Sequence, residues 1–173
     1  PPTAELTLLP AEGCAPLVVD FDNTSTGQYL SFDWDLDIAT STDSIPPTQT
    51  YQQGNDVVFY DISLTVTNYC GSETATDIVT VNPQPIAGFG TDYDEFCTPW
   101  PAEINNISVG NPDTYLWDFG DGSTSTLAEP LVHTFYTDTV PTQYTITLIA
   151  TNECGVDTAS YTITVLPNTV TAF

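Results

Sequence analysis

A repeated Cys-Trp-Cys pattern constrains this chain more than any other feature. Each tryptophan lies 20 residues after the first cysteine of its copy, and the second cysteine follows after a further 36 residues in one copy and 37 in the other. The residues of the pattern are, in chain order, Cys14, Trp34, Cys70, Cys97, Trp117 and Cys154. The chain is therefore a tandem repeat with a period of about 83 residues, and repeats of this kind are usually modular units rather than one active site.

The four cysteines supply one pair to each repeat of about 80 residues, a size at which a core alone gives limited stability. Four cysteines allow three connectivities. We predict disulfides within each repeat, Cys14 with Cys70 and Cys97 with Cys154, because this pairing gives both repeats the same closed loop. Buried free thiols are the alternative, and metal ligation is disfavoured because the sequence has no Cys-x-x-Cys or Cys/His cluster. Disulfides imply an oxidising compartment.

The chain has no Lys or Arg and 23 Asp and Glu residues, which gives a formal net charge of −23. Basic side chains that could neutralise phosphates are absent, so binding to nucleic acid or to an anionic membrane surface is excluded as a function class. No apolar run approaches the roughly 20 residues that span a bilayer, so we expect no direct membrane insertion. Pro1-Pro2 stands where a signal peptide would begin, and we interpret the chain as a mature fragment or a processed product.

Apolar residues alternate with Thr or Ser along four segments, which predicts half-buried antiparallel strands at 62–66, 78–81, 144–148 and 161–165. Asn68–Gly71 and Asn152–Gly155 are predicted hairpin turns. No helical periodicity persists, and the chain is rich in Pro and Gly, so the fold class is all-β with a two-sheet sandwich of about seven strands per repeat. We place the first domain at 1–82 and the second at 83–166. Residues 167–173 are interpreted as a linker and the start of a third repeat, because Thr171-Ala172-Phe173 matches Ala87-Gly88-Phe89 in phase.

Several motifs together resemble the polycystic kidney disease (PKD) domain. They are Gly13-Cys14-Ala15-Pro16-Leu17, Phe21-Asp22-Asn23-Thr24-Ser25, Trp117-Asp118-Phe119-Gly120-Asp121-Gly122-Ser123, His133-Thr134-Phe135, and Tyr144-Thr145-Ile146-Thr147-Leu148 followed by Thr151-Asn152. The resemblance covers nearly the whole chain. It implies tandem immunoglobulin-like β-sandwiches, extracellular, used as spacers or interaction modules. The Cys-bearing, Thr-rich version is similar to repeat arrays of Bacteroidota surface adhesins, including gliding-motility adhesins.

The first repeat departs from this pattern. Trp34-Asp35-Leu36-Asp37 stands where Gly-Asp-Gly would follow the tryptophan, and Gln49 takes the place of His133. Any chemistry of those residues is therefore confined to the second repeat.

His133 is the single histidine and lies in an alternating strand, so we expect a structural or hydrogen-bonding role rather than a Ser-His-Asp or Cys-His system. Asp118 and Asp121 could form a glycosidase carboxylate pair. Asp-Phe-Gly-Asp-Gly is nevertheless typical of a turn in which Asp side chains accept backbone N–H groups and Gly takes positive φ, and we favour that interpretation.

Carboxylates cluster at two places that could hold calcium, which binds several oxygen ligands. The candidate ligands are Asp33, Asp35, Asp37, Asp92, Asp94 and Glu95. No EF-hand loop is present and solvated acidic faces are common, so calcium is an expectation for these residues and no cofactor is required by the sequence.

Short motifs also indicate candidate glycosylation sites. Asn23 and Asn106 begin sequons at equivalent places in the two repeats, although the PKD pattern explains Asn and Ser there structurally. Ser44, Thr139 and Thr158 lie in Asp-Ser/Thr-aliphatic motifs that are similar to O-glycosylation sites of Bacteroidota.

The tryptophans divide into two kinds. Trp34 and Trp117 are predicted core residues near the disulfide of a sandwich. Trp100 lies between two prolines and is expected near a sandwich end, partly exposed, where it could contact a neighbouring domain or, with Tyr115, a sugar.

We therefore predict a non-enzymatic structural module, a stalk or spacer segment of a cell-surface adhesin or extracellular filament. Its expected partners are neighbouring repeats or subunits of the same protein, with a polysaccharide or surface ligand as a further partner. The alternatives are a carbohydrate- or protein-binding accessory module of a secreted hydrolase, and a subunit that polymerises when its terminal strand, Val170–Phe173, joins a neighbour.

Overall fold

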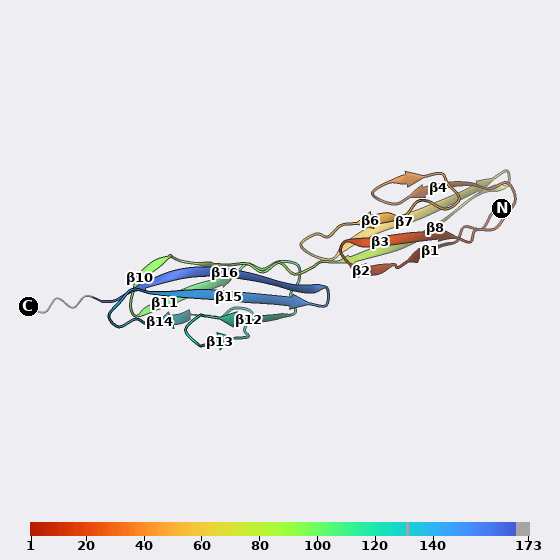
Figure 1. Ribbon diagram of the computed structural model, residues 1–173. Coiled ribbons are helices and arrows are strands. Elements are labelled where there is room, and N and C mark those ends of the chain that lie inside the picture. The colour runs from red at the N-terminus through yellow and green to blue at the C-terminus, as the bar shows by residue number, and fades with distance from the viewer. Residues whose placement is uncertain (131, 169–173) are drawn as a thin grey trace, which may run out of the picture. The chain divides into compact units, whose positions relative to one another are not determined.

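The computed structural model describes residues 1–130 and 132–168, and the predicted third-repeat strand at the C-terminus lies mostly outside them. The chain splits into two compact units, Pro1–Pro83 and Gln84–Phe173, one residue away from the predicted boundary. Each unit is a sandwich of two β-sheets with its own hydrophobic core, and no helix occurs among the described residues (Figure 1).

The first unit combines a three-stranded sheet of order β1-β3-β6 with a five-stranded sheet of order β2-β8-β7-β4-β5. The strands of the small sheet are β1 (Leu6–Leu9), β3 (Leu17–Asn23) and β6 (Gln49–Tyr51). Those of the large sheet are β2 (Glu12–Cys14), β4 (Ser31–Asp35), β5 (Thr40–Ser41), β7 (Val58–Asn68) and β8 (Gly71–Asn82).

The second unit repeats this topology, with sheets of order β14-β11-β9 and β10-β16-β15-β12-β13. Its small sheet contains β9 (Phe89–Thr91), β11 (Trp100–Asn106) and β14 (Val132–Phe135). Its large sheet contains β10 (Glu95–Cys97), β12 (Thr114–Asp118), β13 (Thr124–Ser125), β15 (Thr142–Asn152) and β16 (Gly155–Leu166).

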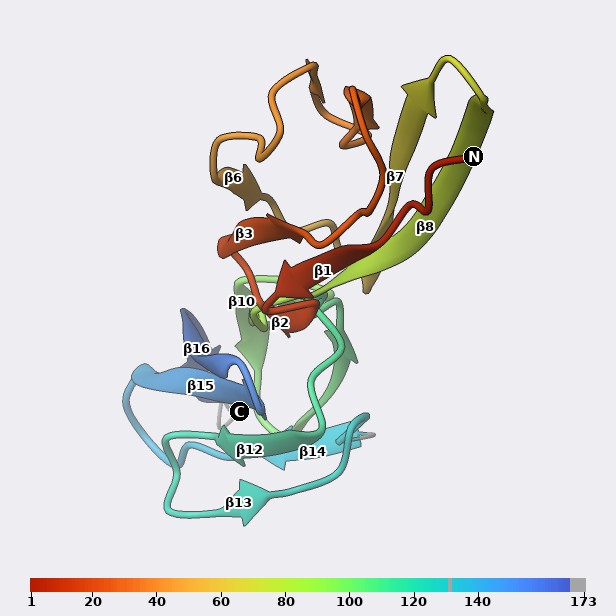
Figure 2. The same ribbon diagram turned by 90° about the vertical axis from the view of Figure 1, so that its right-hand side faces the viewer.

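Each unit has eight strands among its described residues instead of about seven, because its first strand is split between the two sheets. Figure 2 shows this split in the first unit, where β1 and β2 follow each other along the chain. In the first unit β1 pairs antiparallel with β3, whereas β2 pairs in parallel with β8, the last strand of that unit. In the second unit β9 and β10 divide in the same way between β11 and β16. The second strand of each unit, β2 or β10, is therefore the hydrogen-bonded neighbour of the last strand, β8 or β16.

The predicted alternation places one face of each long strand in the core. Leu64 of β7 and Leu148 of β15 are fully buried opposite the tryptophans of the neighbouring strands. Trp34 and Trp117 are 0% exposed, which confirms the predicted core role. Each indole N–H is satisfied as buried Trp requires, by the carbonyl of Asp43 at 3.1 Å in one unit and of Leu127 at 3.0 Å in the other.

The two predicted hairpins are confirmed. They join β7 to β8 and β15 to β16, with Asn68 opposite Gly71 and Asn152 opposite Gly155. In both turns the Asn side-chain oxygen accepts the N–H of the cysteine two residues later, at 2.8 Å in each. This Asx turn, which mimics a backbone turn, holds each cysteine at the tip of a hairpin.

The predicted disulfides within each repeat are wrong. Cys14 and Cys154 are disulfide-bonded, whereas Cys70 and Cys97 are exposed free cysteines. Cys14 lies opposite Asn82 at the end of β8, but Cys70 precedes Gly71 at its start. At roughly 3.3 Å per residue that strand separates them by about 35 Å, whereas the Cα atoms of a disulfide lie about 4.4–6.8 Å apart.

The same geometry excludes the pair in the second unit, where Cys97 lies opposite Leu166 and Cys154 precedes Gly155. The tryptophans, expected near a disulfide, instead contact aromatic rings. Trp34 packs edge-on against Phe21 at 6.0 Å between ring centroids, and Trp117 against Phe89 at 5.3 Å.

Candidate functional site

The turn after Trp117, residues Asp118–Ser123, carries several polar side chains in the second unit. Gly120 and Gly122 have φ of 77° and 91°, a region that L-residues rarely adopt. Asp118 Oδ1 accepts the N–H of Gly120 at 2.9 Å, and Asp121 Oδ1 accepts the N–H of Ser123 at 2.9 Å. The predicted turn role of Asp-Phe-Gly-Asp-Gly is confirmed.

His133 lies across this turn on β14. Its Nε2 is 2.8 Å from Asp121 Oδ2, and its ring stacks on Phe119 with centroids 4.0 Å apart and planes 3° apart. Burial by itself would raise the pKa of the Asp121 carboxyl. The hydrogen bonds from Ser123 and His133 together outweigh burial, so the pKa of Asp121 is lowered from its usual value. The histidine thus ties the strand to the turn, as the predicted structural role requires.

The geometry of this cluster differs from a nucleophile relay. A serine hydrolase needs one ring nitrogen toward the serine and the other toward the aspartate. Here Ser123 Oγ, at 3.5 Å, and Asp121 share the same Nε2, and the Ser123 hydroxyl donates to Asp121 at 2.6 Å. Asp118 and Asp121 are both engaged in the turn, so the cluster can position the backbone but is not arranged as an acid and base.

The first unit forms the equivalent turn without the glycines and without the Asp–His pair. Asp37 takes the place of Gly120, with φ of 65°, and its N–H is accepted by Asp35 Oδ1 at 3.0 Å. On the neighbouring sheet Gln49 is opposite Val19 as His133 is opposite Ala102, so Gln49 does occupy the histidine position.

The predicted calcium ligands are dispersed. Within residues 1–130 and 132–168, no group of three or more Asp, Glu, His or Cys side chains is placed to hold a metal ion. Asp35 is engaged in the turn, and Asp94 accepts a hydrogen bond from the Tyr161 hydroxyl, which raises the pKa of Tyr161. Asp33, Asp92 and Glu95 are exposed.

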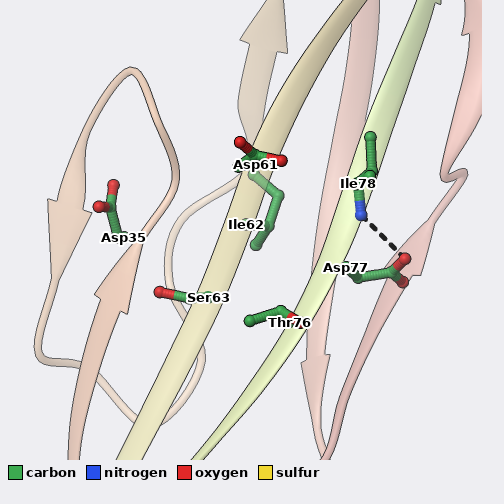
Figure 3. Close-up of a pocket in the computed structure, with 7 residues that line it drawn as sticks. All are labelled: Asp35, Asp61, Ile62, Ser63, Thr76, Asp77 and Ile78. Atoms are coloured by element: carbon green, nitrogen blue, oxygen red, sulfur yellow. Dashed lines mark hydrogen bonds between the residues drawn. The ribbon is translucent and has the colours of Figure 1, made fainter.

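A hollow of about 500 Å³ lies on the outer face of the large sheet of the first unit (Figure 3). It is lined by Asp35, Asp61, Ile62, Ser63, Thr76, Asp77 and Ile78, and Asp77 Oδ1 accepts the N–H of Ile78 at 2.9 Å. The strand registers place Thr145 and Tyr161 of the second unit where the first has Asp61 and Asp77. This acidic hollow is therefore not a repeated feature.

The two sequon asparagines have structural contacts. Asn23 Nδ2 donates to the Ser44 carbonyl at 2.7 Å, and Asn106 Nδ2 donates to the Ala128 carbonyl at 2.8 Å. Their side-chain oxygens accept the N–H of the residue two positions later, each at 3.0 Å. The amide nitrogen that would carry an N-glycan is thus engaged within each unit. Ser44, Thr139 and Thr158 are exposed, and O-glycosylation there stays a prediction.

The expected exposure of Trp100 is wrong. Trp100 is only 7% exposed, stacks on Phe96 and contacts Phe135 in the core. It occupies the position of Leu17 in the first unit, where alternation along the strand turns the side chain inward. Tyr115 is half-buried and packs against the same core. Neither residue offers the open aromatic face expected for a sugar.

Sequence reasoning missed a buried hydroxyl. Tyr51 is 0% exposed, and its hydroxyl donates to the Leu36 carbonyl at 3.0 Å. Burial, with help from the charge of Asp37, raises the pKa of Tyr51 to about 12. Aligning β6 with β14 would have revealed it, because Tyr51 and Phe135 are equivalent and only one carries a hydroxyl.

Among the described residues no helix is long and apolar enough to cross a membrane. Residues 82–166 match the family model of the PKD domain. A search of the curated proteins finds no significant match to the chain.

Three solved structures illustrate the similarity. The PKD1 domain of the Vibrio cholerae metalloprotease PrtV is 34% identical, with 47% of this chain and 96% of that chain covered and a TM-score of 0.38. A Methanosarcina mazei protein is 35% identical, with 51% and 58% covered and a TM-score of 0.39. The Ig1–Ig3 ectodomain of mouse nectin-like molecule 4 is 13% identical, with 99% and 66% covered and a TM-score of 0.63. The last likeness identifies both units as immunoglobulin-like sandwiches.

Proposed function

The chain belongs to the PKD-domain family, and from this premise we propose that it is a non-enzymatic extracellular module, a stalk or spacer segment of a cell-surface adhesin or extracellular filament. The two units share a core, a topology and a hairpin turn, whereas the Asp121–His133 pair occurs in one unit. The features that both units share are structural, whereas the polar pair is confined to one unit. This division supports a structural role for the repeat. The bonded Cys14 and Cys154 support an oxidising location.

One observation carries the proposal. In both units the strand near the start is hydrogen-bonded in parallel to the last strand. In the first unit the Thr80 N–H donates to the Ala11 carbonyl at 2.8 Å and the Ala15 N–H to the Asn82 carbonyl at 3.0 Å. Tension applied through the two ends of a unit pulls these strands in opposite directions along their length. The interstrand bonds then resist together in shear instead of opening one by one, as a spacer under tension requires.

Single-molecule stretching of the whole chain tests this proposal. Under reducing conditions we expect two unfolding events, each of which converts a folded unit into about 80 residues with an extended length of about 28 nm at roughly 3.5 Å per residue. Thr80→Pro should lower the force of one event, because proline removes the N–H that bonds Ala11. Thr80→Val, which keeps the N–H, is the matched control and should leave both forces unchanged.

Two outcomes would count against the spacer role. One is a Thr80→Pro chain whose two unfolding forces equal those of the parent chain. The other is saturable binding of a soluble polysaccharide by the unmodified chain in calorimetry, which would favour an accessory binding module.

A further inference from the structure

The four cysteines fall into two geometric classes. Cys14 and Cys97, the strand-end cysteines, close β2 and β10 opposite the last residues of β8 and β16. Cys70 and Cys154, the hairpin-tip cysteines, follow the Asx turns of the two hairpins. In each unit the classes lie at opposite ends of the last strand. Every unit thus presents one cysteine of each class, at opposite poles.

Each free cysteine has an equivalent that is bonded. Cys154 is disulfide-bonded and Cys70 is free, although their turns have the same Asn oxygen to Cys N–H distance of 2.8 Å. Cys14 is bonded and Cys97 is free, although each lies at the end of a three-residue strand paired in parallel with the last strand. Both local geometries therefore accommodate a disulfide, and each class has one bonded cysteine and one free cysteine.

Both free thiols are accessible. Cys70 and Cys97 are exposed, and Tyr69 beside Cys70 is 96% exposed, so the hairpin tip stands clear of its own unit. Among the cysteines that are bonded, one is of the strand-end class and one of the hairpin-tip class. The two free cysteines are again one of each class.

We propose that Cys97 of one chain forms a disulfide with Cys70 of a second copy, so that copies are linked head to tail. The contact is heterologous, because a strand-end cysteine meets a hairpin-tip cysteine, and a heterologous contact propagates into a line of subunits instead of closing as a symmetric dimer. The inference rests on the cysteine geometry and does not depend on the spacer role.

The bond needs an oxidant, and a small-molecule disulfide such as oxidised glutathione serves. The Cys97 thiolate attacks one glutathione sulfur, forms a mixed disulfide and releases one glutathione thiolate. The Cys70 thiolate of the second copy then attacks the Cys97 sulfur and releases the other. Two cysteine thiols are oxidised to one disulfide, and oxidised glutathione is reduced to two glutathione thiols.

The experiment uses the full chain with its bonded cysteines intact. It is incubated at pH 8 with oxidised glutathione in 1 M salt, where a Debye length of about 3 Å screens the net charge of −23. The reaction is stopped with N-ethylmaleimide, and products are separated on a non-reducing gel and mapped with pepsin at low pH. Cys70→Ser and Cys97→Ser chains are oxidised separately and as an equal mixture, after circular dichroism and thiol counting verify their fold.

We expect a ladder of oligomers from the parent chain and a peptide that joins Cys70 to Cys97. Each serine variant alone should stay monomeric, and their mixture should give dimers, at least tenfold above either variant alone. Dimers from a single variant at the level of the mixture would overturn the proposal. So would a parent chain that stays monomeric, whether as glutathione adducts or with Cys70 and Cys97 joined within one molecule.

Discussion

The two units close the same end of the core with different chemistry. In the first unit the Tyr51 hydroxyl bonds the Leu36 carbonyl, within the segment that follows Trp34. In the second unit Phe135 stands at the Tyr51 position and has no hydroxyl, and His133 beside it joins the turn to the strand. In both units a side chain of the small sheet thus bonds the turn that follows the tryptophan, and the residue that makes this bond differs between the units.

The turn itself shows the same freedom. Its backbone needs positive φ after the tryptophan, and the first unit achieves this with Asp37, the second with Gly120. The two units therefore share the backbone conformation of the turn and the shape of the core. They differ in the polar side chains that form hydrogen bonds with the turn.

Removal of a core tryptophan should give the largest effect. Trp34→Ala and Trp117→Ala are each expected to cost about 3–5 kcal/mol of unfolding free energy, because each deletes a fully buried indole. The loss should stay within one unit, since each core cluster contains residues of that unit alone. Hydrogen exchange of peptides from β7–β8 and β15–β16 measures the two units separately, and equal loss of protection in both after one substitution would contradict independent cores.

Alkaline pH should give the next largest effect, because it should destabilise the first unit through Tyr51. The raised pKa means that Tyr51 keeps its proton in the folded chain at a pH where the unfolded chain loses it. The contribution of Tyr51 to the free energy of unfolding is therefore present below pH 10 and is lost as pH rises toward 12. At about 1.4 kcal/mol per pKa unit the loss approaches about 3 kcal/mol near pH 12. Urea unfolding of the parent chain and Tyr51→Phe from pH 8 to 11.5 gives the difference. The variant should start about 1 kcal/mol less stable, with the Leu36 carbonyl unpaired, and should decline less steeply.

The second unit supplies the control, because Phe135 already lacks the hydroxyl. Phe135→Leu is expected to lower stability by a constant amount across this pH range. A Tyr51→Phe curve that runs parallel to the parent curve would show that Tyr51 ionises no differently in the folded chain.

Most of the fold could be predicted from the sequence, because periodicity reports local structure directly. Alternation fixed the strands that carry Leu64 and Leu148, and Asn-x-Cys-Gly fixed the hairpins. The disulfides could not be predicted from the repeat, because the symmetry argument contains no distances. The predicted turn at Asn68–Gly71 nevertheless implied that Cys70 lies at the far end of a long strand from the linker, and this signal argued against pairing with Cys14.

The candidate site was predicted in part. The turn role of Asp118 and Asp121 follows from residue type, since Asp and Gly act through the local backbone. The contact of His133 with Asp121 and the burial of Trp100 depend on pairing between strands distant in sequence. A flanking pair of prolines suggested an exposed loop for Trp100, but alternation along β11 places that residue in the core.

A methyl group at Gly120 should sharpen the comparison of the turns. A Cβ there would lie 2.6 Å from the Thr145 carbonyl oxygen, and φ is 77°. Gly120→Ala is therefore expected to cost about 2 kcal/mol, the sum of left-handed strain and overlap with backbone. Asp37→Gly in the first unit should change stability by less than about 1 kcal/mol. Hydrogen exchange in β15 and β7 measures both, and a Gly120→Ala chain as stable as the parent would show that the turn can relax.

The smallest effect should come from acid. The pKa of Asp121 is lowered in the folded chain, so its contribution is present above the unfolded pKa and is lost as pH falls through the folded pKa. Asp121 and His133 are partly exposed, and such pairs contribute roughly 0.2–1 kcal/mol.

Other carboxylates titrate in the same range, so the quantity to measure is the stability difference between the parent and Asp121→Asn from pH 6 to 2. This difference should shrink toward zero at low pH. His133→Gln, which introduces the residue found in the first unit, should remove part of this stability difference. A stability difference that does not change with pH would show that Asp121 acts only through hydrogen bonds in the turn that do not depend on its charge.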